Sequence, residues 1–121
     1  MEKIKKQMSF LIEIDKLKNI FRQSLISDKS RNENDAEHSW HMAMYAIILE
    51  EYAPKDTDIL KVIKMALVHD IIEIYAADTF LYDEEMTKSK EKREKEAAEK
   101  EAAEKIYSLL PCSQCDVDRL Y

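Results

Sequence analysis

The residues best suited to carry out chemistry are His69 and Asp70, which end an apolar helical run, together with His38 upstream. Imidazole and carboxylate groups are ligands that a borderline divalent metal such as zinc, cobalt or manganese accepts. A metal held by three such ligands keeps positions open for water and lowers the pKa of that water toward neutrality, which makes it a nucleophile for a phosphoester. The alternative is a helix-end histidine beside an ordinary solvated carboxylate. The three residues are therefore candidate metal ligands, and a purely structural role for them remains the alternative.

Two further acids follow the His-Asp pair. Glu73 lies three residues after Asp70, and Asp78 lies five residues after Glu73. A carboxylate close to a metal-activated water could orient it, accept its proton or protonate the leaving oxygen. Taken alone, each is more typical of a surface acid. Next to a metal site, both become candidate catalytic residues.

Two arginines, Arg22 and Arg31, flank the polar segment ahead of His38. A guanidinium binds phosphate through paired hydrogen bonds, so an arginine there could hold a substrate phosphate. Arginines at helix ends are common, and this expectation therefore depends on the metal site.

Other candidates are weaker. His41 lies three residues after His38 and could share its helix face, but it has no evident acidic partner and is expected to be structural or to orient a ligand. A di-iron carboxylate bundle needs Glu-x-x-His, and the residue three before His69 is Ala66, so that class is excluded. Cys112 and Cys115 form a C-x-x-C without a second pair or a preceding strand, which favours reduced bystander thiols.

The composition predicts an all-α protein. The chain has 121 residues and no glycine, which disfavours hairpin turns and phosphate-binding glycine loops. Its size predicts a single domain with a modest core. The net charge of −6 argues against nucleic-acid polymers and membrane surfaces as partners, although a metal and an arginine could still attract a small phosphorylated substrate. Neither a membrane span nor a signal peptide is evident, so a cytoplasmic protein is expected.

Helices must position these residues. Apolar residues at three- and four-residue intervals predict a helix over about 3–22, and the polar stretch 23–34 is expected to be a loop. Asn34 and Glu37 resemble a capping box that starts a second helix, which Pro54 stops. Asp56 or Thr57 could cap a third helix. Its inward face is expected to consist of Ile59, Val62, Ile63, Ala66 and Leu67.

The third helix also sets the register of the candidate ligands. His69 follows Val62 by seven residues and Asp70 follows Ile63 by seven, so both should project near the apolar face, where an unpaired charge would be costly. After a connection at about 76–83, a charged helix is expected over roughly 84–110, with a tandem Lys-Glu-Ala-Ala-Glu repeat at 95–104.

Three blocks in order resemble the HD-domain metal-dependent phosphohydrolase superfamily, and more narrowly its 5'-deoxynucleotidase-like branch. They are the stretch 31–41 with the pattern R-x-E-N-x-A-E-H, then His69-Asp70-x-x-Glu73, then Asp78. The resemblance covers about residues 9–111 and leaves 112–121 as an atypical tail. It implies an HD-type helical bundle.

The resemblance also implies metal-dependent removal of phosphate from (deoxy)nucleoside 5'-monophosphates. It assigns His38, His69 and Asp70 as ligands of a divalent ion (cobalt, manganese, zinc or similar). Glu73 and Asp78 match the acid/base carboxylates of the family, and Arg22 matches its phosphate-contacting arginine.

The chain departs from the family pattern at two places. Ala77 stands where the family usually has glycine, and the final aspartate ligand of the family lies on a helix well beyond the position of Pro111. Asp118 is not expected to replace it, because the connection after Pro111 looks too short. The expected fold is therefore an HD-like bundle lacking the C-terminal helices. The alternative to an enzyme is a shortened, non-catalytic helical module, and the apolar surface left open predicts a homodimer in either case.

Overall fold

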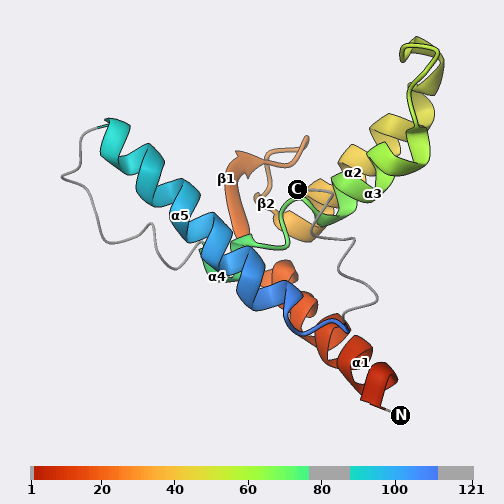
Figure 1. Ribbon diagram of the computed structural model, residues 1–121. Coiled ribbons are helices and arrows are strands. Elements are labelled where there is room, and N and C mark those ends of the chain that lie inside the picture. The colour runs from red at the N-terminus through yellow and green to blue at the C-terminus, as the bar shows by residue number, and fades with distance from the viewer. Residues whose placement is uncertain (1, 77–87, 112–121) are drawn as a thin grey trace.

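The computed structural model describes residues 2–76 and 88–111. The elements in chain order are α1 (Glu2–Ile14), η1 (Asp15–Asn19), β1 (Phe21–Leu25), β2 (Asn32–Asn34), α2 (Asp35–Ile48), η2 (Glu50–Tyr52), α3 (Ile59–Val68), α4 (Glu73–Ala76) and α5 (Lys88–Tyr107). Helices dominate the described residues, and one small two-stranded hairpin lies between η1 and α2 (Figure 1). The predicted all-α class is confirmed.

The first correction concerns the polar stretch expected to be a loop. β1 and β2 pair antiparallel there. The turn between them needs a left-handed residue, and in the absence of glycine Lys29 takes that conformation, with φ 63°. A backbone bond from Ile26 N–H to the Arg31 carbonyl (3.0 Å) and a bond from Ser30 N–H to Asp28 Oδ1 (2.9 Å) close the turn and offset this cost. The lack of glycine disfavours a hairpin but does not prevent this one, because Lys29 takes the left-handed position.

The first helix is also shorter than predicted. It ends at Ile14, and a 3-10 turn leads from it into β1, so Arg22 lies on a strand rather than at a helix end.

The capping box at the start of α2 is confirmed: Asn34 Oδ1 accepts a bond from Glu37 N–H (2.9 Å), and Glu37 Oε2 accepts one from Asn34 N–H (3.2 Å). The third helix is capped by Asp58, the residue after the predicted candidates Asp56 and Thr57.

The main core lies where α1, η1, α4 and α5 meet. Phe10 of α1 stacks against Tyr107 of α5, with ring centroids 6.2 Å apart. The tandem repeat forms part of an unbroken α5, and its Ala102 is buried, as is Ile106 one turn further on. The buried members of this core are Phe10, Leu17, Ile71, Ile72, Ile74, Ala76, Ala102, Ile106 and Tyr107.

Helices α2 and α3 pack against each other and project together from the rest of the molecule (Figure 1). Small side chains face this contact, and Ala43 and Ala66 are buried. Val62 and Leu67, which were expected to face inward, are instead 38% and 46% exposed. Helix α2 covers only part of the apolar surface of α3, and this explains why the predicted burial of Val62 and Leu67 is wrong.

Within the described ranges, no helix is long and apolar enough to cross a membrane.

Candidate metal centre

The fold brings His38, His69 and Asp70 together at the base of the two-helix arm. His38 lies in the second turn of α2, and His69 is the C-terminal cap of α3, with Asp70 next to it. One ligand atom of each residue lies within 4.8 Å of the others. The two imidazole rings are 5.7 Å apart between centroids. The packing of α2 on α3 therefore assembles the three predicted ligands into one cluster.

The protonation of His69 indicates that this cluster suits a cation. Its Nδ1 lies 2.6 Å from the Ala66 carbonyl oxygen, which can only accept, so Nδ1 carries the proton. In the neutral ring, Nε2 then presents a lone pair, and it lies 3.1 Å from Asp70 Oδ2. Two electron-rich atoms facing each other are stabilised by a positive ion that both contact. The set of two imidazoles and one carboxylate fits a borderline divalent metal.

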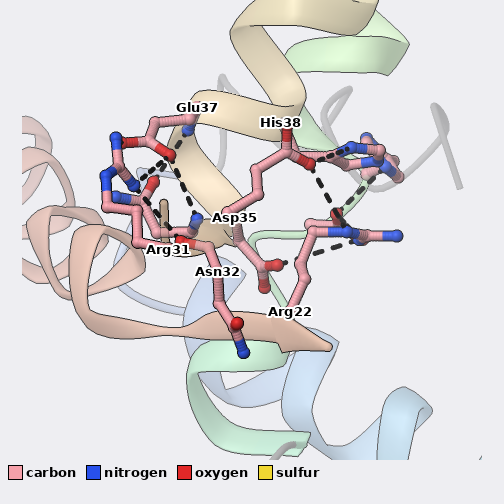
Figure 2. Close-up of polar contacts among 10 residues, drawn as sticks. Arg22, Arg31, Asn32, Asp35, Glu37 and His38 are labelled. Atoms are coloured by element: carbon pink, nitrogen blue, oxygen red, sulfur yellow. Dashed lines mark hydrogen bonds and ion pairs between the residues drawn. The ribbon is translucent and has the colours of Figure 1, made fainter. Parts of the chain in front are cut away.

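Arg22 reaches this cluster from β1 and contacts three carboxylates (Figure 2). Its Nη1 lies 3.4 Å from Asp70 Oδ2 and 3.8 Å from Asp35 Oδ1, and its Nε lies 3.7 Å from Glu33 Oε1. The first contact is a long hydrogen bond that Nη1 donates to Asp70, and the other two are ion pairs beyond hydrogen-bond distance, so none is a short, bidentate pair. Its side chain is 36% exposed, which leaves part of it open to a ligand.

An open cleft of about 410 Å³ lies beside Arg22 and Asp70, within the size range of small-molecule sites. Glu73, at the start of α4, and the buried Asp35 also line it. Burial, with a smaller effect from the Asp70 charge, raises the pKa of Glu73. The same two causes raise the pKa of Asp35 to about 6. A carboxyl with raised proton affinity beside a candidate metal site is suited to proton transfer.

The other predicted residues fall outside this cluster. Arg31 forms a two-bond ion pair with Glu37 (2.7 and 2.9 Å) on the other side of the α2 start, where it ties the hairpin to the helix (Figure 2). His41 is exposed, with its ring against Trp40 and Tyr45, and is not among the cluster residues. The predicted acid Asp78, like Asp118, lies outside the described residues.

Sequence reasoning missed Glu33 and Asp35 as residues of the site. Glu33 belongs to the polar segment expected to be a loop, Asp35 begins α2, and the hairpin turns this part of the chain back toward the metal cluster. The available signal was the capping box: it fixes Asn34 at the start of α2, and therefore places Glu33 and Asp35 on either side of that cap.

Comparisons with known proteins identify a family and a similar structure. A family model described as HD domain matches residues 14–120. A crystal structure of a predicted metal-dependent phosphohydrolase from Magnetospirillum magnetotacticum MS-1 is similar, with 48% sequence identity and a TM-score of 0.83. The match covers 98% of this chain and 57% of that one, so the chain spans little more than half the length of that structure. No curated protein matches.

Proposed function

Because residues 14–120 match its model, this chain belongs to the HD-domain family, and we propose that it is a metal-dependent phosphohydrolase that removes the 5'-phosphate from (deoxy)nucleoside monophosphates. The observation that carries the proposal is the cluster of His38, His69 and Asp70, whose ligand atoms lie within 4.8 Å of one another beside an open cleft. These three residues would hold the divalent ion. When bound, the ion would supply Lewis-acid charge for the phosphate oxygens and for water.

Glu73 is the proposed general base. Its carboxyl is half-buried in the cleft wall, and burial favours the protonated form, so its proton affinity is higher than that of a solvated glutamate. Glu73 would accept a proton from the water whose oxygen attacks phosphorus. The bond between phosphorus and the 5'-oxygen then breaks, and Asp78, which the resemblance places among the acid/base carboxylates, would donate a proton to that leaving oxygen. The products are a nucleoside and inorganic phosphate.

Arg22 is the proposed phosphate-binding residue. It lines the same cleft as Glu73, and its weak contacts with three carboxylates leave its donors available to phosphate oxygens. A guanidinium binds phosphate bidentately, which would orient the phosphorus toward Glu73.

Phosphate release tests this function. After treatment with a chelator and addition of Co²⁺ or Mn²⁺, the full chain should release phosphate from deoxynucleoside 5'-monophosphates and not from the 3'-isomers. Substitution Glu73→Gln should lower kcat by about 10²- to 10⁴-fold, the usual contribution of general-base catalysis. His69→Ala should abolish bound metal and turnover, while His41→Ala, which changes a histidine outside the cluster, should retain both. Equal metal content in the wild type and His69→Ala, with no phosphate released, would refute the proposal.

A second function is favoured by a separate observation. Large apolar side chains on α2 and α3 are exposed, among them Tyr45, Ile48 and Leu60 at 57%, 67% and 61%. They suit a self-associating helical module, the alternative to an enzyme. Metal binding without turnover on any nucleotide, together with a stable dimer, would favour that module.

A further inference from the structure

Glu33 lies beside the metal cluster, but neither the proposed catalysis nor metal binding gives its carboxylate a role. It is the middle residue of β2, five residues before His38, and its side chain is only 17% exposed. Its Oε1 lies 3.0 Å from His38 Nδ1. The capping box between Asn34 and Glu37 fixes the intervening backbone and so holds Glu33 and His38 in this relation.

The contact decides which nitrogen of His38 can bind a metal. An ionised carboxylate has only acceptor atoms, so the hydrogen bond requires a proton on Nδ1. In the neutral ring Nε2 then carries the lone pair. The Ala66 carbonyl imposes the same tautomer on His69, at 2.6 Å from its Nδ1. Two different acceptors therefore present Nε2 of both rings as the ligand atom.

Glu33 also reaches Arg22. The Oε1 atom that contacts His38 lies 3.7 Å from Arg22 Nε, and this nitrogen is buried without a hydrogen bond. One carboxylate oxygen thus lies between a metal ligand and the arginine proposed to bind phosphate. Glu33 is not needed to attach the hairpin to α2, because the ion pair of Arg31 with Glu37 already makes that connection.

We infer that Glu33 is a positioning residue that holds His38 in the tautomer with Nε2 free for a divalent ion and keeps the Arg22 guanidinium beside the same site. The metal part of this inference rests on the proposed function. The tautomer part concerns the metal-free protein alone. Carboxylate partners of metal-binding histidines commonly contribute 10- to 100-fold to metal affinity.

The test compares the full-length wild type with Glu33→Ala and Glu33→Gln. Nitrogen NMR of the metal-free protein, above the ordinary histidine pKa of about 6.5, reports which ring nitrogen of His38 carries the proton. We expect the proton on Nδ1 in the wild type and a mixture of tautomers in Glu33→Ala. Titration with Co²⁺, followed by visible absorption, should give a Kd about 10- to 100-fold higher for Glu33→Ala. Glu33→Gln keeps an acceptor oxygen and should recover the wild-type tautomer and part of the affinity.

The matched control is Glu37→Gln. It removes a carboxylate from the same connection and breaks the ion pair with Arg31, but it retains a side chain able to cap and does not touch His38. It should lower the melting temperature without changing the His38 tautomer or the Kd for Co²⁺. An unchanged tautomer and unchanged Co²⁺ affinity in Glu33→Ala would overturn the inference. A wild type that binds no Co²⁺ would refute the proposed function, and the tautomer measurement would still decide the role of Glu33.

Discussion

At the scale of single residues, the site has more negative than positive charge. Glu33, Asp35 and Asp70 share one guanidinium, that of Arg22, at contact distances between 3.4 and 3.8 Å. Glu73 adds a fourth carboxyl in the wall of the cleft. A divalent cation would improve this balance. In the metal-free protein, the imbalance should appear as a cost in stability.

Asp35 should make this cost measurable. Its pKa is raised from 3.8 to about 6 by burial and by the charges of Asp70 and Glu73, against smaller opposing effects of Arg22 and His69. Because the pKa is higher in the folded state, its contribution is fully present below pH 3.8 and is lost as the pH rises through about 6.

Asp35→Asn should therefore raise the free energy of unfolding of the metal-free protein at neutral pH. We expect about 1 to 2 kcal/mol, less than the full pKa shift would give, because the open cleft lets water screen the charge. The difference from the wild type should vanish near pH 4 in urea unfolding measured with a chelator present. Asp56→Asn, which removes an exposed carboxylate, should show no such difference. A neutral-pH loss of stability in Asp35→Asn would contradict the argument.

At the scale of elements, the connection from β2 to α2 organises the site. Arg31 binds Glu37, Asn34 caps the helix through Glu37, and Glu33 contacts His38. These contacts account physically for most of the R-x-E-N-x-A-E-H pattern. The helix start could be predicted because a capping box is a local signal. The hairpin could not, because its left-handed turn residue is Lys29 and its closing bonds join residues whose pairing only the folded chain shows.

The same distinction applies to the metal cluster. His69 and Asp70 could be predicted because helical register placed them near an apolar face, and His38 because it ends the R-x-E-N-x-A-E-H pattern upstream. Their mutual distance and the place of Arg22 depend on how α2, α3 and β1 pack, which no local pattern encodes.

Removal of the α2 cap should therefore affect both stability and metal binding. Asn34→Ala should lower the free energy of unfolding by about 1 kcal/mol, the usual cost of an N-cap. It should also weaken Co²⁺ binding, since the first turn of α2 orients His38. Asp58→Ala removes the corresponding cap of α3, at the end remote from His69, and should give a similar loss of stability with unchanged Co²⁺ affinity. Equal effects of both variants on Co²⁺ affinity would contradict this prediction.

Tyr75 joins three helices beneath the site. Its hydroxyl on α4 donates to Glu13 of α1 (2.6 Å), and Lys105 of α5 lies 4.2 Å from its ring centroid. The bond to Glu13 is the main reason that the pKa of Tyr75 is raised from 10.0 to about 12. Because the folded pKa is the higher one, the stabilisation is complete below pH 10 and is lost as the pH rises through about 12.

The phenolate absorbance of Tyr75, isolated as the difference between the wild type and Tyr75→Phe, should therefore appear at a pH of about 12, above the ordinary tyrosine pKa of about 10. Glu13→Gln should return the Tyr75 pKa toward 10, because the acceptor loses its charge. Asp15→Asn, which changes a neighbouring acid that does not touch Tyr75, should leave it near 12. A Tyr75 signal that titrates at the ordinary tyrosine pKa of about 10 in the wild type would exclude the bond to Glu13 in solution.

At the scale of the whole molecule, the two parts of the fold differ in how much of their apolar surface is buried. The α1, α4 and α5 part encloses a continuous core, whereas the arm of α2 and α3 leaves large apolar side chains exposed. The similar crystal structure is longer, with 57% of its length matched. Apolar surface of this kind on one projecting arm favours association with another protein surface.

We therefore expect the chain to form a homodimer through the outer end of this arm, where Ile48 closes α2 and Leu60 lies at the start of α3. The net charge of −6 on each copy opposes association at low salt, so added salt should strengthen the dimer. Sedimentation at several protein concentrations should show a dimer for the wild type and at least a 10-fold higher dissociation constant for Ile48→Glu or Leu60→Glu, since each places a charge in the buried apolar contact. Ile12→Glu is the matched control, because Ile12 is 68% exposed on α1, away from the arm. A wild type that is monomeric at every concentration, or a control that dissociates the dimer as strongly, would show that the arm does not mediate self-association.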